Sequence, residues 1–278
     1  TRYTWQGTYT GTLLSNLQPG TFSEELYWIS GCFLLTAFLG CFWFFFATLL
    51  LNLLLVGAGV LEDTLSTRWE AINFGATRHS YGFGHPNTFG FWTLLLIFSG
   101  LLYIPRKGHR ALSCLIYVLL AFCVFRVTDS KAALLSSLAA IVLCLIAFRV
   151  GPWLSSKKWS VPLCLGLYLL GIAAFLSLAL LYREGSSFFS TCNALLSDRL
   201  AYSSAAFRSF GVKLFGAQVH FRWDPVDSLY AYAPICMGLI PTVLYFGLNL
   251  ISLYRAAKAG RWDIVAVAFA GALYSTME

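Results

Sequence analysis

The sequence predicts an all-α fold: a polytopic transmembrane helical bundle with about seven spans and a large external loop. Of its 278 residues, 58% are hydrophobic and 11% are charged, whereas soluble domains are about 45–50% apolar and about 25% charged. Several uncharged runs reach the roughly 18 apolar residues that indicate a membrane-spanning helix. The net charge of +7 therefore needs no nucleic-acid partner, because Lys and Arg accumulate in the cytoplasmic loops of membrane proteins.

One polytopic membrane domain, residues 1–278, accounts for the order of the apolar segments. We expect spans at residues 27–61, 86–104, 111–127, 131–148, 161–181, 227–254 and from 264 onward. The first exceeds the roughly 20 residues that a bilayer needs, so tilt or an interfacial start is expected. Polar segments at 62–85 and 182–226 form two external loops. Because the chain lacks an initial Met and stops as an apolar run ends, we expect a fragment of a longer polytopic protein.

The short loops indicate how the chain crosses the membrane. Their basic residues fall on one side, where only Asp263 opposes them: Arg106, Lys107, Arg110, Arg149, Lys157, Lys158, Arg255, Lys258 and Arg261. By the positive-inside rule this side is cytoplasmic. The two long loops and the turn at 128–131 then lie on the extracellular or periplasmic face of the cell membrane, where every candidate functional residue is expected.

The stretch 78–87, RHSYGFGHPN, runs directly into the second span. Pro86 suits the first position of a helix, where its missing N–H costs nothing, and His85 then stands at the cap. The free N–H groups and positive dipole of this helix would lie beside Arg78, which predicts an anion site, with phosphate as the usual occupant. We expect Gly82 and Gly84 to be structural, because glycine tolerates positive φ and close approach of the backbone.

Two further spans begin on the same face with residues that favour helix starts. Asp129-Ser130 precedes the fourth span, and either Asp224-Pro225 or Asp227-Ser228 precedes the sixth. The side-chain oxygens of such residues are expected to accept hydrogen bonds from the first N–H groups of the helix. Asp227 is as well explained by capping as by contact with a substrate.

Cations accompany these helix starts. Together they predict a basin for a multiply charged anion, such as a lipid that carries a pyrophosphate. The cations are Arg78, Lys131, Arg199, Arg208 and Arg222. Each also has an ordinary explanation. Lys131 is equally well explained as an interfacial lysine, and Arg199 and Arg208, on a possible amphipathic helix at 197–211, as anchors to lipid headgroups.

Three segments resemble one known family. Residues 80–87, SYGFGHPN, resemble the S-L-G-F-G-H-P-N signature of Gram-positive exopolysaccharide and capsule polymerases, which are relatives of the O-antigen polymerases and O-antigen ligases. Residues 128–131 resemble the T-x-S-R turn of that family, with Lys131 in place of Arg. Residues 214–216 and 227–230 resemble its L-F-G and D-N-x-Y segments, with Ser228 in place of Asn.

The resemblance implies an external membrane glycosyltransferase that works without a metal or another cofactor. It would transfer a growing glycan from undecaprenyl pyrophosphate to a sugar hydroxyl of another lipid-linked repeat unit, with other polysaccharide-assembly proteins as possible partners. Arg78 and His85 would be catalytic, His85 either as the general base or as a hydrogen-bond donor to the phosphates. The substrate-binding residues would be Asn87, Lys131, Arg199, Arg208, Asp227 and Tyr230.

Two alternatives stay open. An O-antigen ligase-like transferase would use the same donor site and differ only in its acceptor. A transporter or flippase for lipid-linked oligosaccharides belongs to another class, and it would need polar or charged residues deep within several spans. The spans here hold little more than Asn52 and scattered Ser and Thr, which favours chemistry at the membrane surface.

Overall fold

The computed structural model describes residues 38–63, 78–103, 110–196, 198–216 and 228–277, and all the regular elements in these ranges are helices. The predicted fold class, a polytopic helical bundle, is confirmed. Within these ranges, five helices are long and apolar enough to cross a membrane, and two apolar segments, Cys41–Gly57 and Trp262–Met277, are shorter. The five are α4 (Pro86–Tyr103), α5 (Arg110–Thr128), α6 (Lys131–Ser155), α7 (Ser160–Leu181) and α11 (Leu239–Lys258).

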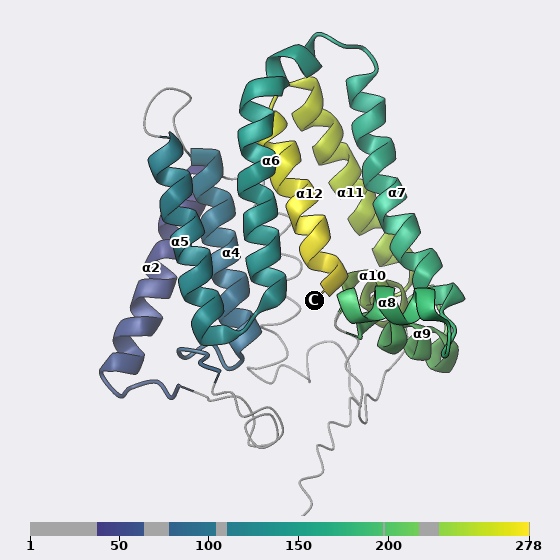
Figure 1. The fold of residues 1–278 in the computed structure, drawn as a ribbon, viewed down its shortest axis with the longest axis horizontal. Coiled ribbons are helices and arrows are strands. Elements are labelled where there is room, and N and C mark those ends of the chain that lie inside the picture. Colours follow the sequence, from purple (N-terminus) through teal and green to yellow (C-terminus); the bar gives the residue numbers. More distant parts are fainter. Residues whose placement is uncertain (1–37, 64–77, 104–109, 197, 217–227, 278) are drawn as a thin grey trace, which may run out of the picture. The chain divides into compact units, whose positions relative to one another are not determined.

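The described residues form two compact units, whose helices Figure 1 labels. Unit 2 contains α2 (Phe38–Gly57), α4, α5, α6 and most of α12 (Trp262–Met277). Unit 1 contains the helices from α7 to α11 together with residues 275–277, the last turn of α12. Of the two predicted external loops, 62–85 therefore belongs to unit 2 and 182–226 to unit 1.

Unit 2 is built around α4. This helix packs against α2, α5 and α6, and 67% of it is buried, against 22% of α5. Its Leu94, Ile97 and Leu101 are among the largest fully buried side chains. A cluster of apolar side chains joins α4 to its neighbours: Cys41, Phe45 and Leu49 from α2, Phe89, Leu95 and Leu96 from α4, and Val124 from α5. Among the five candidate spans, α4 has the largest buried share, so the candidate site at its start rests on a firmly packed helix.

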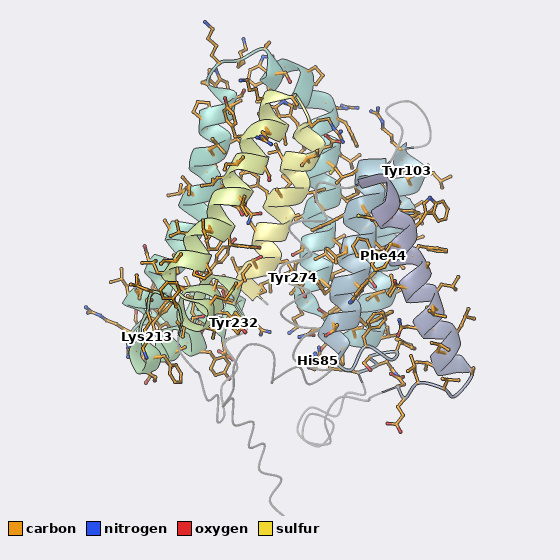
Figure 2. The ribbon with its side chains drawn as sticks, turned by 180° about the vertical axis from the view of Figure 1, so that it is seen from behind. Phe44, His85, Tyr103, Lys213, Tyr232 and Tyr274 are labelled. Carbon is orange, nitrogen blue, oxygen red and sulfur yellow. The ribbon has the colours of Figure 1, made fainter. Side chains whose placement is uncertain are left out.

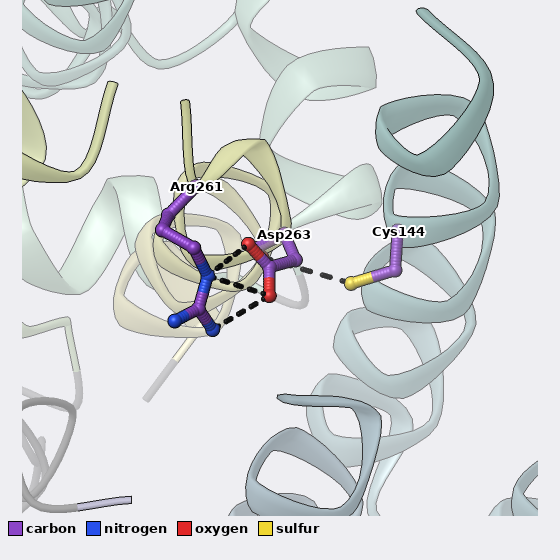
Figure 3. A network of polar contacts seen from close by, with 3 residues as sticks. All are labelled: Cys144, Arg261 and Asp263. Carbon is purple, nitrogen blue, oxygen red and sulfur yellow. Dashed lines mark hydrogen bonds and ion pairs between the residues drawn. The ribbon is translucent and has the colours of Figure 1, made fainter. Parts of the chain in front are cut away.

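Polar contacts hold the start of α12 against α6. The indole N–H of Trp262 donates to Ser155 Oγ at 2.9 Å, and the Cys144 thiol donates to the carbonyl of Asp263 at 3.7 Å. Arg261 donates from Nε and Nη2 to the Asp263 carboxylate at 2.9 Å and 2.8 Å, as Figure 3 shows. The first two contacts join α12 to α6, and the Arg261–Asp263 ion pair lies within the start of α12.

The C-terminal ends of the predicted first and fourth spans differ from the structure. The first helix ends at Gly57 rather than 61, and its predicted start at 27 lies outside the described residues. The fourth span continues to Ser155 instead of ending near Phe148, with Arg149 and Pro152 inside the helix. Charged residues mark the end of the hydrocarbon layer, but the helix need not stop there, because its backbone bonds are internal.

Unit 1 begins with α7, which agrees with the predicted fifth span to within one residue. Two short helices follow, α8 (Ser187–Leu195) and α9 (Arg199–Phe210), and they lie at the end of α7 (Figure 1). A helix was expected at 197–211, and α9 confirms it. The sequence analysis missed α8, whose Ser, Thr and Asn residues compete with the helix backbone and so weaken the pattern.

The predicted sixth span, 227–254, is wrong as a continuous helix. Its described part consists of α10 (Leu229–Tyr232), the π-helical segment η2 (Ala233–Met237) and α11, with a break at Gly238, where φ is +96°. Pro234 and Gly238 explain the interruption, because proline removes a backbone donor and glycine accepts a backbone conformation that other residues avoid.

Residues 213–216 cover this break with their own backbone. The N–H of Leu239 donates to the carbonyl of Lys213 at 2.8 Å, and the N–H of Ile240 donates to that of Leu214 at 3.1 Å. The two backbone segments meet at glycines, since a Cβ on Gly216 would lie 2.1 Å from the Cys236 carbonyl oxygen. The break therefore requires glycine at this position.

We predict that Gly216→Ala destabilises the protein more than Gly185→Ala. The two glycines have nearly the same φ, +84° and +83°, so each alanine incurs the left-handed cost of about 1–2 kcal/mol. Only at Gly216 does the new methyl group also collide with backbone, since a Cβ at Gly185 meets nothing within 4 Å. Thermal unfolding in detergent measures the difference, and equal midpoints for the two variants would contradict the packing described here.

Candidate functional site

The candidate site is the turn that leads into α4. The helix begins at Pro86, as predicted, and His85 directly precedes it. Figure 2 shows His85 and Tyr103 at opposite ends of unit 2. We call residues 78–87 the HPN turn. It belongs entirely to unit 2.

His85 caps α4 with both its carbonyl and its ring. The Asn87 N–H donates to His85 Nδ1 at 3.2 Å, and the Thr88 N–H donates to the His85 carbonyl at 3.1 Å. The expectation of free N–H groups at this helix start is therefore wrong, because His85 already accepts them and Pro86 has none. Since Nδ1 accepts, the proton of the neutral ring lies on Nε2. His85 is exposed, and in this tautomer Nε2 can act as a hydrogen-bond donor.

Arg78 joins the HPN turn to two helix ends. Its Nε donates to the carbonyl of Thr128, the last residue of α5, at 2.6 Å. Its Nη2 donates to Asn87 Oδ1 at 2.5 Å. A cation is favoured at the C-terminal end of a helix dipole, and both bonds run to neutral oxygens. The structure thus brings together three predicted site residues, Arg78, His85 and Asn87, with Asn87 bonded to each of the others.

The shape of the turn depends on its glycines and aromatic rings. Gly82 and Gly84 have φ of +82° and +77°, as predicted. Gly82 also approaches α2 closely, since a Cβ there would lie 3.1–3.3 Å from three side-chain atoms of that region. The Tyr81 and Phe83 rings pack on Phe89 of α4, with centroids 5.1 Å and 5.7 Å away. The turn is therefore anchored in the core of unit 2.

A pair that the sequence analysis missed, Asp63 and His79, lies beside this turn. His79 Nδ1 is 2.6 Å from Asp63 Oδ2, and Asp63 Oδ1 accepts the N–H groups of Ser80 at 3.0 Å and Tyr81 at 2.8 Å. Burial raises the pKa of the Asp63 carboxyl, but the His79 bond and the two backbone N–H groups lower it further, so the net pKa lies below its usual range.

Thr128, whose carbonyl accepts the Arg78 bond, connects the HPN turn to the start of α6. Ser130 occupies the predicted N-cap position, but its side chain makes no capping bond, which corrects the expectation. The hydroxyl is buried against Gly90 of α4, where a Cβ would lie 3.1 Å from it. Instead, Thr128 Oγ1 accepts the Ser130 N–H at 3.2 Å. Lys131, the first residue of α6, is exposed and makes no hydrogen bond or ion pair with a described residue.

The other predicted site residues belong to unit 1. Arg199 Nε donates to the Met277 carbonyl, and Arg208 Nη2 donates to the Tyr182 carbonyl at 2.7 Å. Tyr230 is buried, and its ring packs between Phe175 and Phe246, 5.6 Å and 5.7 Å away. Asp227 lies outside the described residues. For these four residues a role in substrate binding stays a prediction.

The predicted cap of the sixth span also needs correction. Ser228 stands at the N-cap of α10 without a capping bond, and its hydroxyl donates to the Ser275 carbonyl at 3.2 Å instead. The serine is fully buried, so its side chain turns to the nearest acceptor inside unit 1. Neither Ser130 nor Ser228 therefore caps its helix with its side chain.

The described residues contain no group of three or more His, Cys, Asp and Glu side chains that could hold a metal ion. Compared with protein-family models, with curated proteins and with solved structures, the chain matches none.

We predict that replacing Asp63 by Asn removes an acid-sensitive part of the stability. Because the folded pKa of Asp63 lies below its unfolded value of about 3.9, the stabilisation is complete above about pH 4 and is lost as the pH falls through the folded pKa. Thermal unfolding from pH 7 to pH 3 should show wild type more stable at pH 7 and a gap that narrows below about pH 4.

The matched control is Glu62→Gln, which removes the exposed carboxylate next in the chain. This variant should unfold with the pH dependence of wild type. A gap between wild type and Asp63→Asn that stays constant down to pH 3 would contradict the role given to the Asp63 bonds.

Proposed function

We propose that the protein is a membrane polysaccharide polymerase. It would transfer a growing glycan from undecaprenyl pyrophosphate to a lipid-linked repeat unit on the external face of the membrane. The observation that carries the proposal is the bond from Arg78 to Asn87 at the start of α4. This bond joins an arginine to the last residue of the stretch that resembles the polymerase signature.

The leaving group of this reaction is a pyrophosphate, so catalysis needs positive charge and hydrogen-bond donors where negative charge develops. Arg78 would supply the charge. A guanidinium has five N–H donors in a fixed fork, and the bonds to Thr128 and Asn87 hold that fork in place before substrate arrives. The Nε2–H of His85 would add a donor to a phosphate oxygen. Lys131, exposed at the start of α6, would attract the same anion.

The apolar helices support the second requirement, a lipid-linked donor. In the described part of the chain, five helices have the length and composition to cross a bilayer. The undecaprenyl chain would stay in the membrane while the pyrophosphate reaches the polar turn. Arg199 and Arg208 would contribute to the site from α9 or would bind lipid headgroups. A ligase-like transfer to another acceptor uses the same donor chemistry and differs in the product.

One observation favours a second candidate, a transporter of lipid-linked oligosaccharides. Transporters use discontinuous helices whose broken backbone lies at a substrate site, and the predicted sixth span is broken at Gly238. The break is covered by the backbone of residues 213–216, so in this structure its N–H groups bind protein.

The test is polymer synthesis by the protein in lipid nanodiscs supplied with undecaprenyl-pyrophosphate repeat units. We expect a ladder of lengthening glycans on a gel. Arg78→Lys keeps the positive charge but loses the forked donors of the guanidinium, so it should slow the formation of the glycan ladder. Arg78→Ala should slow it by about 10²–10³-fold, the usual effect of removing one donor to the developing charge.

Arg126→Ala is the matched control, because Arg126 is an exposed arginine in the last turn of the same α5 helix. It should leave the ladder unchanged. A single product that forms only with a different acceptor would show that the protein is a ligase and not a polymerase. Movement of the lipid across the bilayer with no covalent product would show that it is a transporter.

A further inference from the structure

His79 has the geometry of an oriented histidine. Its Nδ1 lies 2.6 Å from Asp63 Oδ2, its backbone N–H donates to the Val127 carbonyl at 2.8 Å, and its ring stacks on Tyr81 with centroids 5.5 Å apart. The side chain is 37% exposed. The ring is thus held by Asp63 and Tyr81, the backbone is held by Val127, and the side chain is partly exposed to solvent.

Asp63 determines which nitrogen of this ring carries the proton. Its other oxygen accepts two backbone N–H groups, those of Ser80 and Tyr81, an arrangement that stabilises an ionised carboxylate. A carboxylate only accepts hydrogen bonds, so His79 Nδ1 must donate. The neutral ring then carries its lone pair on Nε2, which makes no hydrogen bond with any described residue.

His85 is held in the opposite tautomer. Its Nδ1 accepts the Asn87 N–H, so its Nε2 carries the proton and can donate but cannot accept. A general base must offer a lone pair, and an oxyanion needs a donor. Of the two histidines beside Arg78 in this turn, His79 is suited to accept a proton and His85 to bind a phosphate oxygen.

We propose that His79, oriented by Asp63, is the general base of the glycosyl transfer; this inference rests on the proposed polymerase function. The acceptor hydroxyl oxygen attacks the anomeric carbon of the donor sugar and forms the new glycosidic bond. The bond from that carbon to the pyrophosphate oxygen breaks, and its electron pair leaves with the lipid pyrophosphate beside Arg78. The hydroxyl proton moves to His79 Nε2 and passes to water before the next transfer.

Asp63 acts as a positioning residue in this scheme, because it bonds to His79 and not to substrate. Asn at this position would still accept the backbone N–H groups, but its NH₂ would donate to Nδ1 and turn His79 into the wrong tautomer. Asp63→Asn should therefore change the tautomer of His79 while it keeps the backbone hydrogen bonds that shape the turn.

The experiment is steady-state glycan transfer in nanodiscs by wild type, His79→Gln, Asp63→Asn and the control His220→Gln. No role in the candidate site is assigned to His220. We expect His79→Gln and Asp63→Asn each to lower kcat by about 10²–10⁴-fold, the usual contribution of general-base catalysis, with KM within about threefold. Added imidazole should restore part of the activity of His79→Ala, which a structural role would not allow.

His85→Gln provides the contrast, since it should raise KM for the lipid-linked donor more than it lowers kcat. Thermal unfolding of each variant reports folding, and Asp63→Glu, which restores the carboxylate, should recover part of kcat if Asp63→Asn is unstable. If wild type makes the ladder and His79→Gln keeps more than a third of its kcat, the assignment of His79 is overturned while the polymerase stands. If wild type transfers no glycan, both fall together.

Discussion

The guanidinium of Arg78 joins the last carbonyl of α5 to the first turn of α4, and the geometry of the candidate site depends on this link. Every helix leaves four N–H groups at its start and four carbonyls at its end without intrahelical partners. With only 11% charged residues, the chain has few side chains to bind them. Arg78 and His85 do so here, which means that the groups suited to a ligand also hold two helices together.

Unit 1 meets the same constraint with backbone alone. The break at Gly238 exposes N–H groups at the start of α11, and carbonyls of Lys213 and Leu214 accept them. This contact is possible because Gly216 and Gly238 bring backbone against backbone with no side chain between. The Leu-Phe-Gly stretch at 214–216, which the sequence analysis singled out as part of a motif, therefore has a structural role in closing a broken span.

The fold class and most span limits could be predicted because a membrane imposes long apolar runs that any window detects. The start of α4 at Pro86 and the positive φ of Gly82 and Gly84 followed from residue chemistry. The partners of individual side chains could not be predicted in this way. Asp63 and His79 lie 16 residues apart with no periodic pattern between them, and Ser130 sits at a cap position but turns toward Gly90. Such contacts depend on which atoms lie nearest in three dimensions, and the sequence does not show this.

The two histidines of the HPN turn show how neighbours convert one residue type into two chemistries. Asp63 offers only acceptors, so His79 must donate from Nδ1 and keep its lone pair on Nε2. The Asn87 N–H offers only a donor, so His85 must accept at Nδ1 and keep its proton on Nε2. Displacement of a pyrophosphate by a hydroxyl requires one group that accepts a proton and another that donates to the departing anion. A single neutral imidazole cannot present both functions at the same nitrogen, and a turn with two histidines in opposite tautomers can.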